Sequence, residues 1–143
     1  MSKLLGILAL AAMLPAYAQT DADREAIRGV ALDYIEGWYA GDGARMERAL
    51  HPELAKRMVQ SEGGESRLDR QDKATLVGNT AAGGGKRTPV GEQRKEVQIL
   101  DIYENAASVR IDASGWVDYL HLARWNGEWK IVNVLWELRP PSR

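Results

Sequence analysis

Residues 116–138 read WVDYLHLARWNGEWKIVNVLWEL and contain two runs rich in β-branched and aromatic residues, joined by Asn126-Gly127. Asn-Gly is the strongest short-range signal for a β-hairpin, because a type I′ turn needs two residues that tolerate positive φ. Two more runs rich in Val, Ile and Tyr precede this hairpin, and short turn sequences separate them. The sequence therefore predicts an antiparallel sheet with strands over residues 97–104, 107–113, 116–125 and 128–138.

The part of the chain before these strands is predicted to begin with a long helix. Apolar residues recur at helical spacing over residues 27–38, after Asp21 or Asp23 as the candidate N-cap. The pattern ends near Gly41, a residue type that commonly follows the last turn of a helix. This amphipathic helix would cover the apolar side of the sheet.

Two shorter helices are expected between the long helix and the sheet. One ends at Leu50, two residues before Pro52, which cannot continue a helix. The other, capped by Asp72, would end at Gly83-Gly84-Gly85, which we interpret as a flexible linker. Residues 59–70 are polar and show no periodicity, so we expect a loop there. The sequence thus predicts one α+β domain with three N-terminal helices and a sheet of four or more strands.

Residues 1–18 predict a secretory signal peptide. Lys3 supplies positive charge, Leu4–Leu14 form an apolar stretch, and Ala16-Tyr17-Ala18 fits a cleavage site after Ala18. A helix of about eleven apolar residues spans about 16 Å, well short of the roughly 30 Å hydrocarbon core, so no membrane anchor is predicted. We expect a secreted or periplasmic protein whose mature part, residues 19–143, is a single domain.

The composition argues against several classes of function. The formal net charge is −1 with both signs interspersed, which argues against a nucleic-acid partner. The chain has no cysteine and only two histidines, His51 and His121, far apart, so we predict no disulfide, no metal site and no cofactor. Five Trp and five Tyr with no Phe suit pocket walls and interfaces, since each carries a polar group on a large apolar body.

Three segments of the chain resemble a known family. They are Val97–Ile111, Asp118–Leu122 and Trp125–Trp136, together with the IEGWYAGD sequence of residues 35–42 and the His51-Pro52 step. They are similar to the putative lumazine-binding branch of the nuclear-transport-factor-2-like superfamily, over nearly the whole mature chain. The resemblance implies a cone-shaped, cystatin-like fold, frequent dimerisation through the sheet, and a hollow between sheet and helices that relatives use for binding or catalysis. It does not imply lumazine itself.

Candidate pocket residues follow from counting outward from the predicted turns. The count places Leu120 opposite Asn133 and Asp118 opposite Leu135, all on the aliphatic face that should meet the first helix. A polar side chain on that face needs a partner, so Asp118 and Asn133 are either pocket groups or groups satisfied by the backbone near the sheet edge. Two aromatic residues of the first helix are either pocket walls or plain core. The ligand-binding candidates are Tyr34, Trp38, His51, Asp118, Leu120 and Asn133.

The opposite face of the sheet is predicted to be covered by a second copy of the chain. It is too apolar and aromatic for a solvated surface, and the count places Asp101 opposite Arg110 as a cross-strand ion pair. The alternative for His121, a catalytic base acting with Asp118, is disfavoured because residues three apart on a strand point to opposite faces. The interface candidates are Tyr103, Arg110, Tyr119, His121, Val132, Val134 and Trp136.

Two classes of function remain open from the sequence. The favoured one is an exported binding module that holds a small apolar or aromatic ligand, and no catalytic residues are predicted for it. The alternative is a cofactor-free lyase, isomerase or cyclase that uses Asp118 with Asn133, Tyr34 or His51. A carboxylate buried beside a second titratable group would favour the enzyme.

Overall fold

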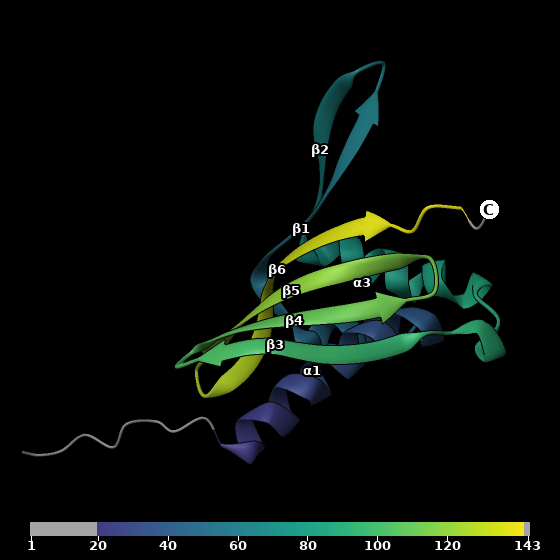
Figure 1. Ribbon diagram of the computed structural model, residues 1–143. Helices are drawn as coiled ribbons and strands as arrows, with labels where there is room; N and C mark the ends of the chain where they lie inside the picture. Colours follow the sequence, from purple (N-terminus) through teal and green to yellow (C-terminus); the bar gives the residue numbers. More distant parts are fainter. Residues whose placement is uncertain (1–19, 142–143) are drawn as a thin grey trace, which may run out of the picture.

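The computed structural model describes residues 20–141 and consists of helices packed on one side of a curled sheet (Figure 1). The six strands lie in the order β2-β1-β6-β5-β4-β3. All neighbouring strands are antiparallel except β1 and β6, which are parallel. The predicted α+β class is confirmed. The predicted signal peptide lies outside the described residues.

The long helix α1 (Asp21–Ala40) lies across the sheet, as predicted. Its N-cap is Thr20, whose hydroxyl accepts from the backbone N–H of Asp23, while Asp23 reaches back to Thr20. This reciprocal arrangement is a capping box. The prediction of Asp21 or Asp23 as the N-cap is therefore wrong, because Asp23 lies one turn into the helix. Gly41 ends α1 with a φ of 68°, a conformation that favours glycine.

The two shorter helices also form. α2 (Gly43–Ala49) is capped by Asp42, and α3 (Lys73–Ala81) is capped by Asp72, as predicted. α2 ends one residue before the predicted limit, since Leu50 already begins a strand. Two 3₁₀ turns, η1 (Gly84–Arg87) and η2 (Val90–Glu92), follow α3.

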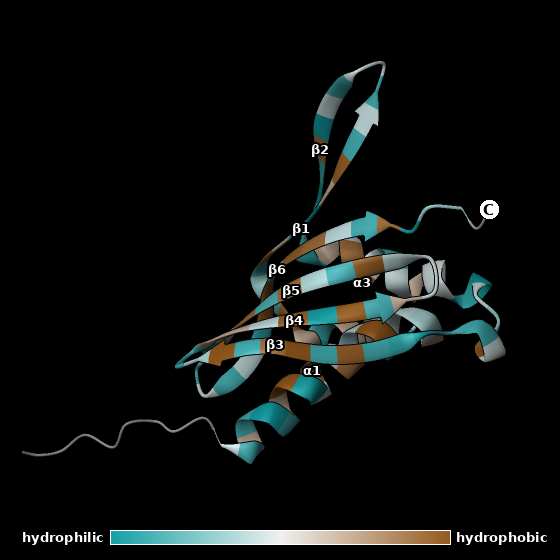
Figure 2. Ribbon diagram, viewed as in Figure 1, coloured by the Kyte–Doolittle hydropathy of each residue, from teal (hydrophilic) through white to brown (hydrophobic). Residues whose placement is uncertain are grey.

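Residues 59–70 form a β-hairpin, so the predicted loop is wrong. β1 (Leu50–Glu62) pairs with β2 (Glu65–Gln71) from Lys56 opposite Gln71 to Glu62 opposite Glu65. The turn is Gly63-Gly64, both with positive φ. Most of the hairpin projects beyond the rest of the sheet and is exposed on both faces, so it lacks the apolar alternation of a half-buried strand (Figures 1 and 2).

The four predicted strands are confirmed as β3 (Lys95–Tyr103), β4 (Ala106–Ala113), β5 (Trp116–Trp125) and β6 (Glu128–Leu138). The core lies between their inner face and the helices, where apolar residues gather (Figure 2). Fully buried members from both layers include Ile27, Ile35, Val109, Leu120, Leu122, Ile131 and Val134.

Two bulges change the predicted register. In β6, His121 pairs with Asn133 but Leu122 pairs with Ile131, so Val132 is an extra residue. In β3, Ile99 pairs with Val109 but Asp101 pairs with Ser108, so Leu100 is an extra residue. Each bulge transfers the residues beyond it to the opposite face of the sheet.

Candidate functional site

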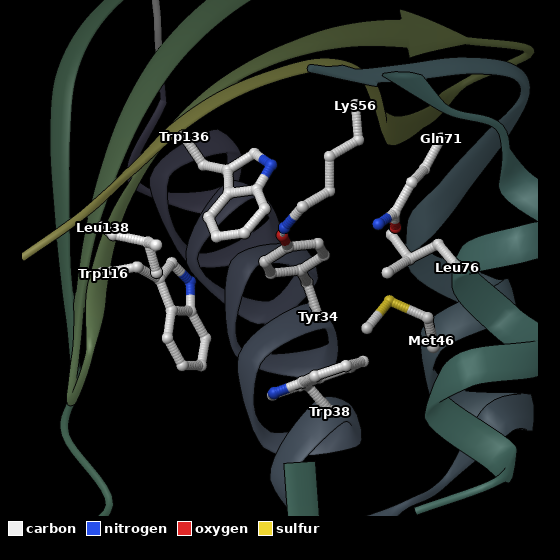
Figure 3. Close-up of a pocket in the computed structure, with 9 residues that line it drawn as sticks. All are labelled: Tyr34, Trp38, Met46, Lys56, Gln71, Leu76, Trp116, Trp136 and Leu138. Atoms are coloured by element: carbon white, nitrogen blue, oxygen red, sulfur yellow. Dashed lines mark hydrogen bonds between the residues drawn. The ribbon is translucent and has the colours of Figure 1, made fainter. Parts of the chain in front are cut away.

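A cavity of about 250 Å³ opens beside the inner face of the sheet, at the end of α1 where β1, β2 and β6 meet the helices (Figure 3). Its lining comes from seven elements: the three helices α1, α2 and α3, and the four strands β1, β2, β5 and β6. The lining residues are Tyr34, Trp38, Met46, Lys56, Gln71, Leu76, Trp116, Trp136 and Leu138. The walls are thus mainly aromatic and aliphatic, and Lys56 is the one charged residue in this lining.

The η1 turn holds Trp38 in place at one end of the cavity. A Cβ atom built on Gly85 would lie 2.2 Å from the backbone oxygen of Trp38, and one built on Gly84 would lie 2.6 Å from its ring. Both distances are too short for any side chain, so only glycine lets this turn approach the indole so closely. The interpretation of Gly83-Gly84-Gly85 as a flexible linker is wrong, because the segment is a 3₁₀ turn packed on α1.

A buried polar cluster lies behind the cavity wall. The Lys56 ammonium group lies 3.2 Å from Asp118 Oδ1 and also donates to the Tyr34 hydroxyl. Tyr34 in turn donates to Asp118 Oδ1 at 3.2 Å, and the Trp116 indole N–H donates to Asp118 Oδ2 at 2.6 Å. Asp118 is completely buried and the Lys56 side chain is 9% exposed. The two charges therefore neutralise each other out of water.

The strand register brings these residues together. Asp118 on β5 faces Ile111 on one side and Trp136 on the other, and all three point inward. Lys56 on β1 faces Val134 of β6 and Gln71 of β2, so its side chain enters the same interior. Residues from β1, β2, β5 and β6 thus meet beside the aromatic side chains of α1.

The environment fixes the chemistry of the cluster. Burial, followed by the negative charge of Asp118 and the hydrogen bond to it, raises the pKa of Tyr34 well above its ordinary value. Tyr34 therefore remains a neutral hydroxyl that donates to Asp118. The Lys56 ammonium group also lies 4.8 Å from the ring centre of Trp136, whose face attracts a cation.

Three of the predicted pocket residues lie at the cavity or directly behind it. Tyr34 and Trp38 line it. Asp118 points inward as expected, but it lies behind Lys56, Tyr34 and Trp116 and does not line the cavity. Leu120 is fully buried in the core and also lies outside the lining.

The other two predicted pocket residues lie elsewhere. His51 is buried, accepts a hydrogen bond from the Glu53 N–H at 3.0 Å and packs edge-on against Trp125, so it stabilises the start of β1. The placement of Asn133 on the inner face is wrong, because the bulge at Val132 turns it to the outer face. There it accepts from Arg57 at 3.0 Å and lies 3.3 Å from His121.

The same bulge divides the predicted interface residues. Tyr103, Arg110, Tyr119 and His121 lie on the outer face, with Tyr103 74% and Tyr119 42% exposed. The placement of Val134 and Trp136 on that face is wrong, since Val134 is fully buried and Trp136 lines the cavity. Val132 is the bulge residue itself and borders a shallow hollow on the outer face with Tyr103 and His121.

The predicted ion pair between Asp101 and Arg110 is also wrong. The turn at Glu104-Asn105 pairs Tyr103 with Ala106 and so places Asp101 opposite Ser108, and the extra residue Leu100 then places Gln98 opposite Arg110. Arg110 instead forms two hydrogen bonds to Asp112, of 2.8 and 2.9 Å, and donates to the Tyr119 hydroxyl.

Most residues of the cavity lining are not predicted from the sequence. Lys56 was missed because its segment was not recognised as a strand. In a strand, the two adjacent charges Lys56 and Arg57 between Ala55 and Met58 point to opposite faces, so one of them faces inward. Trp136 was assigned to the wrong face. Nothing in the local pattern distinguished the other missed residues, which are Met46, Gln71, Leu76, Trp116 and Leu138.

Neither a cluster of metal ligands nor a membrane-spanning helix is found in the described part of the chain. Over residues 20–141 no cluster of three or more His, Asp or Glu side chains is arranged to hold a metal ion. None of the helices between those limits combines the length and apolar character that crossing a membrane requires.

Comparison with known proteins agrees with the fold and with the family. Residues 22–137 match the family described as "Putative lumazine-binding". No curated protein matches the chain.

Solved structures similar to this chain share its fold. A nuclear-transport-factor-2-like protein of unknown function from Shewanella baltica OS155 is 23% identical, with a TM-score of 0.65 over 83% of this chain and 95% of that one. One from Methylobacillus flagellatus KT, also of unknown function, is 19% identical, with a TM-score of 0.65 over 85% and 95%. A ketosteroid isomerase-like protein from Erwinia carotovora atroseptica SCRI1043 is 10% identical, with a TM-score of 0.56 over 85% and 100%. At these identities the likeness establishes the nuclear-transport-factor-2-like, cystatin-like fold.

Proposed function

Because the chain belongs to the family described as putative lumazine-binding, we propose that it is an exported module that binds a small apolar or aromatic molecule. The observation that carries this proposal is the cavity walled by Trp38, Trp116, Trp136 and Tyr34. A concave site with mainly apolar and aromatic walls and a few polar groups is typical of small-molecule binding. Indole and phenol rings offer flat faces against which a flat ligand packs.

The polar cluster favours binding over catalysis by Asp118. The two carboxylate oxygens of Asp118 accept hydrogen bonds from Lys56, Tyr34 and Trp116, and this carboxylate does not line the cavity. To remove a proton from a ligand, Asp118 would first have to give up its ion pair with Lys56 and become accessible. The carboxylate is better suited to hold Lys56 and two aromatic side chains in fixed orientations.

The proposed function predicts that filling the cavity abolishes binding. Leu76→Trp would place a large side chain inside it, whereas Leu68→Trp on the exposed hairpin leaves it open. The test is native mass spectrometry of each protein purified from the exported fraction of its source cells. We expect a small molecule bound to the wild type and to Leu68→Trp, and lost from Leu76→Trp. The same molecule retained by Leu76→Trp, or none bound to the wild type, would contradict the proposal.

One observation favours the enzyme as a second candidate. A fully buried carboxylate does lie beside two other titratable groups, Lys56 and Tyr34, and the latter two line the cavity. In a cofactor-free lyase or isomerase, Lys56 would transfer the proton and Asp118 would hold it in place. This candidate requires turnover: a small molecule bound by the wild type would be converted, and Lys56→Met would still bind it but not convert it.

Export by the signal peptide is part of the proposal. Cleavage after Ala18 would leave a mature chain that begins at Gln19, directly before the Thr20 cap of α1. N-terminal sequencing of the protein from the periplasm or the medium tests this, and an intact Met1 in that fraction would contradict it.

We also propose that the outer face of the sheet is covered by a second copy. Tyr103, Tyr119 and Leu135 leave large apolar areas exposed on that face. Tyr103→Glu combined with Tyr119→Glu is expected to give a monomer in light scattering. A wild type that is monomeric at high protein concentration would contradict this.

A further inference from the structure

The polar side chains that line the cavity offer more hydrogen-bond donors than acceptors. Within residues 20–141 the Trp136 indole N–H has no acceptor, and this atom is not sealed from solvent. Lys56 has three N–H donors, of which two are directed to Tyr34 and Asp118. The Gln71 amide, which makes no hydrogen bond within the same residues, adds two donors and one acceptor. A ligand in this cavity therefore meets more donors than acceptors.

The charge balance of the cavity disfavours a charged ligand. Lys56 is the only charged residue of the lining, and Asp118 directly behind it neutralises it. A cationic ligand would meet the Lys56 ammonium group at close range in a poorly hydrated space. An anionic ligand would compete with Asp118 for that same ammonium group and would leave one of the two carboxylates without a counter-ion. An uncharged ligand avoids both penalties.

The dimensions of the cavity limit the ligand to a compact one. Its volume of about 250 Å³ is below the roughly 300–1,000 Å³ typical of sites for drug-sized molecules. An apolar cavity of roughly 150 Å³ already accommodates benzene. The space between the indoles therefore fits one ring or two fused rings.

We propose that the cavity selects an uncharged, planar molecule of one or two fused rings whose ring nitrogen or ring carbonyl accepts a hydrogen bond from Lys56. This inference rests on the proposed function as a binding module and assigns Lys56 as its specificity-determining residue. The Asp118 carboxylate and the Tyr34 hydroxyl fix the position of the Lys56 ammonium group, and its third N–H is left for the ligand. The indoles supply the packing faces, and Lys56 supplies the selection for an acceptor.

A set of two-ring probes of nearly equal shape separates the parts of this proposal. Naphthalene has no acceptor, quinoline has a ring nitrogen, 1-methylquinolinium is a cation and 2-naphthoate is an anion. Their dissociation constants for the mature chain are measured at neutral pH by quenching of tryptophan fluorescence. We expect quinoline to bind about tenfold or more tightly than naphthalene, as a hydrogen bond from a charged donor permits. Both charged probes should bind more weakly than quinoline.

A double variant tests the role of Lys56 without leaving an unpaired buried charge. Lys56→Met with Asp118→Asn removes both charges, keeps a side chain of similar length, and retains an acceptor for Tyr34 and Trp116. We expect its affinity for quinoline to fall to that for naphthalene, with naphthalene binding unchanged. A control variant, Arg57→Met, alters the neighbouring residue on the outer face and should keep the full preference.

Each outcome decides the inference. Equal binding of naphthalene and quinoline to the wild type, or tightest binding of a charged probe, overturns the inference and leaves the binding function standing. Failure of every probe to bind overturns both. Retention of the quinoline preference by the double variant removes Lys56 from its role. Should the double variant not fold, the ranking of the four probes on the wild type still decides whether the cavity selects an uncharged acceptor.

Discussion

The Lys56 ammonium group and Asp118 Oδ1 lie 3.2 Å apart in the interior, although the two residues are 62 positions apart in the sequence. Tyr34 bridges them, so three elements, α1, β1 and β5, meet at one ion pair. Removing one partner of such a pair leaves an uncompensated buried charge, whereas removing both charges does not.

Lys56→Met alone is therefore expected to lower the free energy of unfolding by about 3–5 kcal/mol. Adding Asp118→Asn should restore most of that loss, because the amide oxygen of the new side chain would still accept a hydrogen bond without carrying a charge. Urea unfolding of the wild type, both single variants and the double variant gives the coupling energy between the two positions. Simple addition of the two single losses would contradict the buried ion pair.

Tyr34→Phe tests the bridging hydroxyl. The change removes the donor to Asp118 and the acceptor of Lys56, and we expect a loss of about 1–3 kcal/mol in the free energy of unfolding. Tyr103→Phe is the matched control, because Tyr103 is largely exposed and its loss should stay within about 0.5 kcal/mol. Equal losses for the two variants would contradict the cluster.

Gly85→Ala is expected to destabilise the protein by about 3 kcal/mol or more, since overpacking against backbone leaves no room to relax. The new Cβ would meet the backbone of Trp38, and the fluorescence spectrum of that indole should shift as the η1 turn moves away. Gly78→Ala in α3 is the control, as its Cβ would meet no atom within 4 Å. That variant should gain about 0.5–1 kcal/mol from the higher helix propensity of alanine.

Asp112 gives the protein a defined response to acid. Hydrogen bonds from Arg110, and next from Arg139, lower the pKa of Asp112 well below its usual range. The pKa of Asp112 is lower in the folded state than in the unfolded state. The ionised Asp112 carboxylate with its two arginines therefore stabilises the protein fully above a pH of about 4, and this stabilisation is lost progressively as the pH falls further. Asp112→Asn should therefore be less stable than the wild type at neutral pH, by about 1 kcal/mol.

The difference between wild type and Asp112→Asn should shrink as the pH is lowered from about 4, in unfolding curves recorded at several pH values. Asp69→Asn is the control, because Asp69 pairs with Arg67 on the exposed hairpin and such pairs contribute little. A difference that stays constant down to the lowest pH would contradict the role of Asp112.

The sequence predicted the fold where local signals were strong. The helical spacing of α1, the Asp72 cap of α3 and the Asn126-Gly127 turn each identify their element without help from tertiary contacts. The β1–β2 hairpin was missed because its exposed strands need no apolar alternation, and only Gly63-Gly64 indicates the turn.

The candidate site was only partly predictable. Tyr34 and Trp38 follow from the apolar stripe of α1, and Asp118 follows from a hairpin count that stays in register between β4 and β5. Beyond Val132, however, β6 has apolar residues on both faces, so its sequence cannot reveal where one extra residue is inserted. Because of that bulge, Val134 and Trp136 face inward and Asn133 faces outward, the reverse of the prediction. Lys56 could not be predicted as a site residue because β1, the strand that carries it, is not recognised from the sequence.

The most direct test of the account is an NMR titration of the indole N–H signals of the five tryptophans with quinoline, each signal assigned from a Trp→Phe variant. We expect saturable shifts for Trp38, Trp116 and Trp136, which line the cavity, and unchanged signals for Trp125 and Trp129, which lie outside it. Unchanged signals from all three cavity indoles, or shifts confined to Trp125 and Trp129, would contradict it.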